Sequence, residues 1–156
     1  MSYRVGIGVD AHAFGDGVPL VLGGVQFDSP RGLSGHSDGD VITHALIDAV
    51  LGAAGLADIG SLFPSDASTP EGISSLDLLR DALEQVNAAG YAVVNADCIL
   101  IGEEPRISGR RAELERTLTE LVGAPVTVRA TTTDKLGFTG RGEGLAAEAV
   151  ALVMRS

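Results

Sequence analysis

An alternation of apolar with small or polar residues marks the first strand of the chain. Val5, Ile7 and Val9 occupy odd positions, and the even positions between them carry glycine. A period of two is typical of a β-strand that buries one face. We therefore predict a strand over residues 3–12, with an apolar face formed by its odd positions.

Turn and cap residues divide the rest of the chain into further elements. A Gly-Gly pair favours a hairpin, Ser and Asp favour the start of a helix, and a single glycine favours its end. The expected elements are a hairpin of Val18–Leu22 and Val25–Phe27, helices over 38–54, 74–88, 106–122 and 143–154, and strands over 91–101 and 125–133.

The order of these elements predicts the fold class. Strands alternate with helices, but a hairpin interrupts the alternation. This order favours an α+β fold, in which residues 1–156 form a single domain with a mixed four-stranded sheet, helices on one face and a small hairpin. Helices on one face leave the other face uncovered. The apolar side of the first strand would then pack around the axis of an oligomer.

Composition excludes several kinds of partner. The chain has 156 residues, a net charge of −10 and 4% aromatic residues, which argues against binding to nucleic acid or an anionic membrane. No apolar run is long enough to span a bilayer. Cys98 lies in an apolar strand pattern and is expected to be an inert core residue. The first strand begins without a preceding targeting segment, so the expected location is cytoplasmic.

Two of the three histidines form a candidate metal site with a carboxylate. Asp10 and His12 are two residues apart, so both side chains point to one face of the predicted strand. His44 lies on the predicted helix that follows. One carboxylate and two imidazoles with a fourth position left open are typical of a catalytic site for zinc or another divalent transition metal. The alternative is a hydrated polar stripe without a metal.

A second group of polar residues ends the strand predicted at 125–133. Residues 131–135 provide three hydroxyls, the carboxylate of Asp134 and the ammonium of Lys135. Such a set can bind phosphates, and a carboxylate oxygen suits Mg²⁺ or Mn²⁺. A run of threonines is also typical of ordinary β-propensity. The glycines of residues 137–144 permit a close approach to a phosphate or form a simple turn.

Several separated motifs resemble those of one family. They are Asp-Ala-His at 10–12, His-Ser-Asp-Gly-Asp through His at 36–44, Ala-Asp-Ile-Gly at 57–60, and the segment 131–144. In this order they resemble the 2-C-methyl-D-erythritol 2,4-cyclodiphosphate synthases over nearly the whole chain. The resemblance implies an enzyme of the non-mevalonate isoprenoid pathway. Its reaction would convert 4-diphosphocytidyl-2-C-methyl-D-erythritol 2-phosphate, a small cytidine diphosphate substrate, into the cyclic diphosphate and CMP.

The resemblance also implies an assembly and residue roles. The family forms homotrimers with active sites between subunits. Asp10, His12 and His44 match its zinc ligands, and Asp134 matches the ligand of a second metal, Mg²⁺ or Mn²⁺, where the family usually has Glu. His36 and Thr132 match residues that stabilise the transition state. The positions implied to contact the substrate are Asp10, His12, His36, Ser37, Asp58, Ile59, Gly60, Phe63, Pro64, Ser65, Asp66, Ala67, Gly102, Pro105, Arg106, Ile107, Ser108, Thr131, Thr132, Thr133, Asp134, Lys135, Phe138 and Arg141.

Two other functions use the same residues. A zinc-dependent phosphohydrolase would share the ligands but would use water as the nucleophile. A non-catalytic trimeric zinc-binding module would need a closed shell of four ligands, whereas the sequence offers three good ones. Analysis of the product formed from the linear substrate distinguishes these alternatives.

Overall fold

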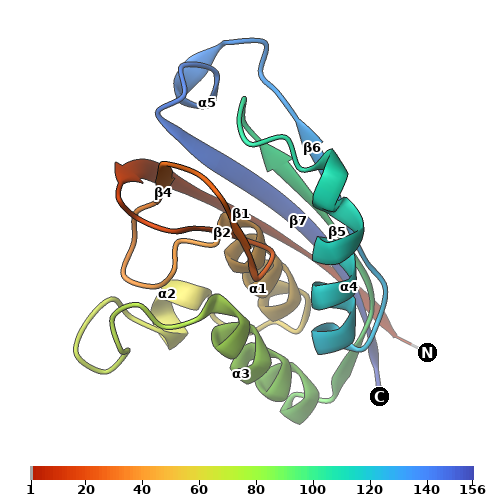
Figure 1. The fold of residues 1–156 in the computed structure, drawn as a ribbon. Coiled ribbons are helices and arrows are strands. Elements are labelled where there is room, and N and C mark those ends of the chain that lie inside the picture. The colour runs from red at the N-terminus through yellow and green to blue at the C-terminus, as the bar shows by residue number, and fades with distance from the viewer. Residues whose placement is uncertain (1) are drawn as a thin grey trace.

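A five-stranded mixed sheet forms the centre of the structure, a computed structural model that describes residues 2–156 (Figure 1). Its strands follow the order β4-β1-β7-β5-β6, in which β5 and β6 are parallel and the other neighbours are antiparallel. A separate antiparallel pair, β2 and β3, forms the predicted hairpin. The strands are β1 (Tyr3–Asp16), β2 (Leu20–Leu22), β3 (Val25–Phe27), β4 (Arg31–Leu33), β5 (Tyr91–Ile101), β6 (Val126–Thr131) and β7 (Gly144–Arg155).

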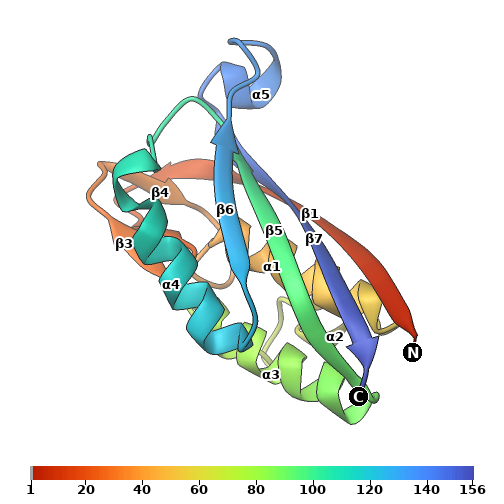
Figure 2. The ribbon, with the colours of Figure 1, turned by 90° about the vertical axis from the view of Figure 1, so that its right-hand side faces the viewer.

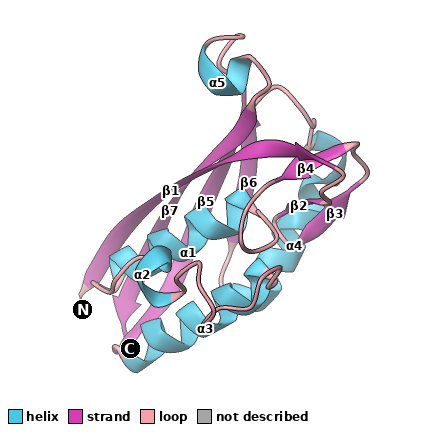
Figure 3. Cartoon of the chain, turned by 90° about the vertical axis from the view of Figure 1, so that its left-hand side faces the viewer, coloured by secondary structure: helices cyan, strands magenta, loops and turns pink. Residues whose placement is uncertain are grey.

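The three long helices cover one face of the sheet, as predicted (Figure 2). Both ends of the described chain lie at the same end of the sheet, and the helix α5 lies at the opposite end (Figure 3). None of the helices within residues 2–156 has the length and apolar character needed to cross a membrane. The cytoplasmic location stays a prediction. The helices are α1 (Val41–Ala53), α2 (Ile59–Leu62), α3 (Ser75–Ala88), α4 (Arg111–Val122) and α5 (Gly137–Gly140), with a 3-10 turn η1 (Ser108–Arg110).

Helix α1 packs directly on the backbone of β1. A Cβ atom added at Gly8 would lie 1.9 Å from the carbonyl oxygen of Ala45, and one at Gly6 would lie 2.1 Å from that of Ala49. Only glycine therefore fits at these two positions of β1 while α1 stays in place. The result is that the helix and the strand carrying the candidate metal ligands lie in close contact.

Asp40 fixes the start of α1. Its carboxylate accepts hydrogen bonds from the backbone N–H of Thr43 at 3.0 Å and from the hydroxyl of Thr43 at 2.7 Å. It also accepts from the N–H groups of Gly23 and Gly24 in the hairpin, at 2.9 and 2.7 Å. Asp40 is fully buried, and its carboxylate is satisfied by these four hydrogen-bond donors. This N-cap ties the hairpin to the helix.

The prediction of a final helix over 143–154 was wrong, because this segment is strand β7. It pairs with β1 on one side and with β5 on the other, at the centre of the sheet. Leu145, Ala147 and Ala149 alternate with less buried residues and face the helical layer. Alanine has high helix propensity, but here its small side chain allows α1 to approach the sheet. With β7 and the short β4, the sheet has five strands instead of the predicted four.

The face of the sheet opposite the helices carries exposed apolar side chains. Val5, Ile7 and Val9 of β1 are each more than half exposed, at 67%, 66% and 58%, and Val150 of β7 is 46% exposed. The odd positions of the first strand thus form an apolar face that the chain itself does not cover.

Cys98 is fully buried in β5, as predicted, and burial raises the pKa of its thiol to about 12.

The contact between α1 and β1 generates a stability prediction. Replacement of Gly8→Ala should lower the free energy of unfolding by about 2–3 kcal/mol, since the new methyl group overlaps a helix carbonyl that cannot rotate away. Urea denaturation followed by circular dichroism measures this change. Gly109→Ala is the control, because its Cβ would meet no atom within 4 Å. A stable Gly8→Ala variant would show that this close packing does not constrain the fold.

Candidate metal centre and its cavity

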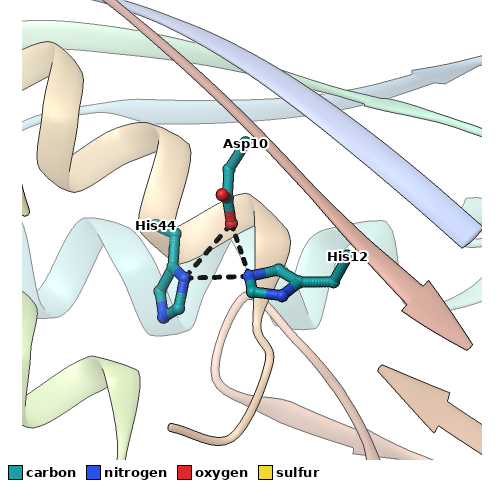
Figure 4. Close-up of side chains that lie close together, drawn as sticks. All are labelled: Asp10, His12 and His44. Atoms are coloured by element: carbon teal, nitrogen blue, oxygen red, sulfur yellow. Dashed lines mark hydrogen bonds and ion pairs between the residues drawn. The ribbon is translucent and has the colours of Figure 1, made fainter. Parts of the chain in front are cut away.

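Asp10, His12 and His44 converge as the sequence predicted (Figure 4). An oxygen of Asp10, Oδ2, lies 2.8 Å from Nε2 of His12 and 3.1 Å from Nδ1 of His44. The two ring nitrogens are 3.3 Å apart. Ligand atoms around a tetrahedral zinc ion with bonds of about 2.0–2.1 Å are separated by roughly 3.3 Å. The three atoms therefore fit one metal ion, and their set of one oxygen and two nitrogens leaves a fourth position open.

Asp10 and His12 each stabilise the charged form of the other. Burial by itself would raise the pKa of Asp10, but hydrogen bonds and charge interactions with His12 and His44 outweigh it and lower the pKa to about 2. The hydrogen bond to Asp10 is also the main reason that the pKa of His12 is raised. An ionised carboxylate between two imidazoles attracts a cation, so the electrostatics agree with the geometry.

Neighbouring polar groups hold the two imidazole rings. Nδ1 of His12 lies 2.9 Å from the carbonyl oxygen of Ser34, which can only accept, so this nitrogen carries the proton. On the far side of the other ring, Nε2 of His44 lies 2.7 Å from Oγ of Ser75 and 3.0 Å from Oγ of Ser37. Each ring thus turns a different nitrogen toward Asp10. A proton on the outer nitrogen leaves the inner one free to bind a metal.

The candidate metal ligands open onto a cavity of about 140 Å³. This cavity brings together four of the predicted segments, because it includes residues near 10–12, 36–37, 44 and 59–65 of the sequence. Its walls are Asp10, His12, His36, Ser37, His44, Ile59, Gly60, Phe63, Ser65, Thr69, Ile73 and Leu78.

The loop with His36 lies against the segment 69–73. Nε2 of His36 donates to the carbonyl oxygen of Thr69 at 2.6 Å, and the N–H of Gly72 donates to the carbonyl oxygen of His36 at 2.6 Å. On another side of the cavity, Asp58 caps the short helix α2 by accepting from the N–H of Ser61 at 2.9 Å. These local contacts place His36 and α2 at the rim of the cavity.

Some residues predicted near the substrate do not line this cavity. Pro64, Asp66 and Ala67 belong to the same loop as Phe63 but lie outside the walls. The carboxylate of Asp66 accepts from the N–H and the hydroxyl of Ser68 at 2.8 and 2.5 Å, which stabilises a local turn.

The second polar cluster lies apart from the metal ligands within one chain. Residues 131–135 follow β6 toward α5 at the far end of the sheet and contribute nothing to the cavity walls (Figure 1). The hydroxyl of Thr132 contacts Asp134 at 3.5 Å, and Asp134 and Lys135 have left-handed backbone angles, φ 52° and 67°. This turn exposes the two charged residues, and Arg141 beyond it forms an ion pair with Glu143.

The segment 102–108 also lies outside the metal cavity. The N–H of Gly102 donates to the carbonyl oxygen of Thr131 at 3.0 Å, so this segment and the second polar cluster are neighbours. Pro105 lines a separate hollow of about 260 Å³ together with Phe14 and Arg31. Ile107 is buried in the core. The structure therefore places most of the predicted site residues in two groups, one at the Asp–His–His cluster and one around the end of β6, while Phe138 lines a further hollow with His12.

Sequence reasoning did not assign site roles to several residues that touch the metal ligands. Ser34 and Ser75 contact His12 and His44 directly, and Asp38 contacts Ser75. Ser75 is 31 residues from His44 in the chain, so no spacing relates the two. Only the packing of α3 against α1 brings them together. The sequence also gave no indication that Thr69 and Ile73 line the cavity, because only the folded chain brings them beside the other wall residues.

The chain is similar to a protein family and to several known proteins over nearly its whole length. The model of the YgbB family matches residues 3–154. A protein of Alkalilimnicola ehrlichii named 2-C-methyl-D-erythritol 2,4-cyclodiphosphate synthase is 52% identical over 97% of this chain and 95% of its own length. The bifunctional IspDF structure from Campylobacter jejuni has a TM-score of 0.95 and 37% identity, over 99% of this chain and 43% of that one. The Plasmodium falciparum IspF CDP complex has a TM-score of 0.85 and 30% identity, over 99% and 97%.

The family match and these identities extend over almost the whole chain, and the Asp–His–His cluster lies within the matched residues. The chain therefore belongs to the YgbB family.

Proposed function

We propose that this chain is a lyase of isoprenoid biosynthesis that converts 4-diphosphocytidyl-2-C-methyl-D-erythritol 2-phosphate into 2-C-methyl-D-erythritol 2,4-cyclodiphosphate and CMP. The observation that carries the proposal is the open Asp–His–His cluster beside a cavity, in a chain about half identical to synthases of that name. Residues 1–156 would act as one catalytic domain.

The reaction requires positioning and charge neutralisation. The 2-phosphate of the substrate attacks the β-phosphorus, the new P–O bond closes the ring, and CMP leaves with the electron pair of the broken P–O bond. Both phosphates are anionic and repel each other. A zinc ion held by Asp10, His12 and His44 would supply positive charge next to the reacting phosphate. The attacking oxygen is already ionised, so no general base is needed.

The cavity walls provide the rest of the local chemistry. His36 and Ser37 lie beside the metal ligands and offer an imidazole and a hydroxyl to a phosphate oxygen. Ile59 and Phe63 form an apolar wall that suits the methylerythritol carbon chain. We assign the contacts with this part of the substrate to residues 58–67.

The cytidine and diphosphate would be held by the second group of residues. We infer that residues 102–108 and 131–135 of one subunit complete the cavity of another in a homotrimer, with Asp134 holding Mg²⁺ or Mn²⁺. Two features support this inference: these residues lie apart from the cavity within one chain, and the apolar face of β1 is uncovered. Burial of that face between subunits would stabilise the assembly.

The alternative functions have less support. A phosphohydrolase would use the same ligands, but no relative named here is a hydrolase. A structural zinc site would need a fourth protein ligand, and within residues 2–156 the cluster contains three.

Isotope labelling tests the reaction class. The linear substrate should give equal amounts of CMP and cyclic diphosphate, without oxygen from the solvent. A tethered phosphate outcompetes water because well-oriented intramolecular reactions reach effective molarities of about 10⁵ M or more. The measurement is phosphorus NMR and mass spectrometry after reaction in ¹⁸O-labelled water. Label in the phosphate products, or a linear diphosphate as the main product, would identify a hydrolase instead.

Two histidine variants test the metal ligands. His44→Ala should remove zinc and most activity but keep the fold, since one of three ligands is lost and alanine is favourable in a helix. His36→Ala is the matched control. It lines the same cavity but is absent from the cluster, so it should keep zinc and lose activity. Metal analysis after dialysis measures the zinc bound by each variant. Full zinc occupancy in His44→Ala would exclude His44 as a ligand.

Mixing two inactive variants tests whether the site is shared between subunits. His44→Ala lacks a zinc ligand, and Asp134→Asn lacks the charge for the second metal. Refolded together in equal amounts, they should recover about one quarter of the wild-type activity, because random assortment leaves both residues intact at about one interface in four. Light scattering should give three times the chain mass of 15.9 kDa. An inactive mixture that still forms mixed trimers would place both residues of a site in one subunit.

A further inference from the structure

Ser75, the first residue of α3, is a fully buried polar residue beside the metal ligands. Its Oγ lies 2.7 Å from Nε2 of His44, on the side of the ring that faces away from Asp10. Buried polar side chains are in most cases hydrogen-bonded, and the hydroxyl of Ser75 has two partners. The partners of Ser75 therefore fix the orientation of its hydrogen atom.

The direction of these hydrogen bonds follows from Asp38. The hydroxyl of Ser75 also contacts Oδ1 of Asp38, and an ionised carboxylate can only accept. The hydroxyl hydrogen therefore points to Asp38, and Oγ accepts a hydrogen bond from the Nε2–H of His44. With its proton on Nε2, His44 presents the lone pair of Nδ1 toward Asp10 and the metal position.

Asp38 is itself held firmly. Its Oδ2 accepts from the backbone N–H of Ser75 at 3.0 Å, and its Oδ1 accepts from that of Asp40 at 3.1 Å. Its own N–H donates to the carbonyl oxygen of Ile73 at 3.2 Å. These contacts join the loop of residues 36–38 to the start of α3, so the carboxylate has one well-defined position.

In the same arrangement, His44 does not need the hydroxyl of Ser37 as a hydrogen-bond partner. Its Oγ lies 3.0 Å from Nε2 of His44, but that nitrogen has one hydrogen to donate and Ser75 is nearer. Since Ser75 accepts this hydrogen, the hydroxyl of Ser37 can turn toward a ligand without leaving His44 unsatisfied. Ser37 lines the cavity, whereas Ser75 does not. The two serines thus have separate roles at one ring nitrogen.

We propose that Ser75 and Asp38 are positioning residues that hold His44 in the ring orientation and tautomer needed to bind the metal. The inference rests on the proposed metal site at Asp10, His12 and His44. Hydrogen-bond partners of metal-binding histidines typically change metal affinity by about 10–100-fold when they are removed. Neither Ser75 nor Asp38 touches the metal position, so they act through His44.

Zinc affinity of Ser75→Ala, measured by competition with a chromophoric chelator, tests the proposal. The variant should bind zinc about 10–100-fold more weakly than the wild type. Activity lost at limiting zinc should return at saturating zinc. Ser74→Ala is the control, because this neighbouring serine makes no side-chain hydrogen bond to the helix start. Its affinity should match the wild type. Equal affinity in Ser75→Ala would overturn the proposal, whereas a wild type that binds no zinc would instead refute the metal site.

A measurement on the wild type makes the test independent of whether the variant folds. The chain has only three histidines, so ¹⁵N-histidine labelling gives a simple spectrum. In the zinc-loaded protein, two-bond ¹H–¹⁵N correlations should show His44 protonated on Nε2 and metal-bound through Nδ1. His12 should show the opposite arrangement. A zinc-bound His44 protonated on Nδ1 would contradict the role of Ser75.

Discussion

The close contact between α1 and the sheet is the constraint on which the rest of the structure depends. Gly6 and Gly8 leave no Cβ atoms between β1 and the helix, and the alanines of β7 continue this flat surface. Since β1 carries Asp10 and His12 and α1 carries His44, the distance between the two elements sets the distances between the metal ligands. A larger residue in this contact would move the helix and separate the ligands.

Two carboxylates, of which Asp40 is fully buried, then fix the start of α1. Asp40 receives four donors and holds the helix to the hairpin, and Asp38 receives three and holds the preceding loop to α3. The buried carboxylate of Asp40 is tolerated because donors surround it in this way. One loop of the chain therefore joins the helix that carries His44, the loop that carries His36, and the serine that orients His44. The Asp–His–His cluster and the cavity beside it share this support.

One chain holds two separate groups of predicted site residues, and one face of its sheet is uncovered. Asp10 and His12 meet His44 of α1 on the helical side of β1, while the end of β6 leads to α5, at the opposite end of the sheet from the chain ends (Figures 1 and 3). An apolar surface formed by Val5, Ile7 and Val9 favours burial against another molecule.

The sequence by itself determined the Asp–His–His cluster, the first strand, most helices and the family resemblance, because each depends on local spacing or on strings of adjacent residues. Asp10 and His12 share a face through the strand period, and Asp40 caps α1 through a contact three residues away. Tertiary structure decided the rest. The alanine-rich segment of β7 has helix propensity, yet its two neighbouring strands make it a central strand. Ser75 meets His44 only because α3 packs on α1, a contact between distant parts of the chain that no local pattern encodes.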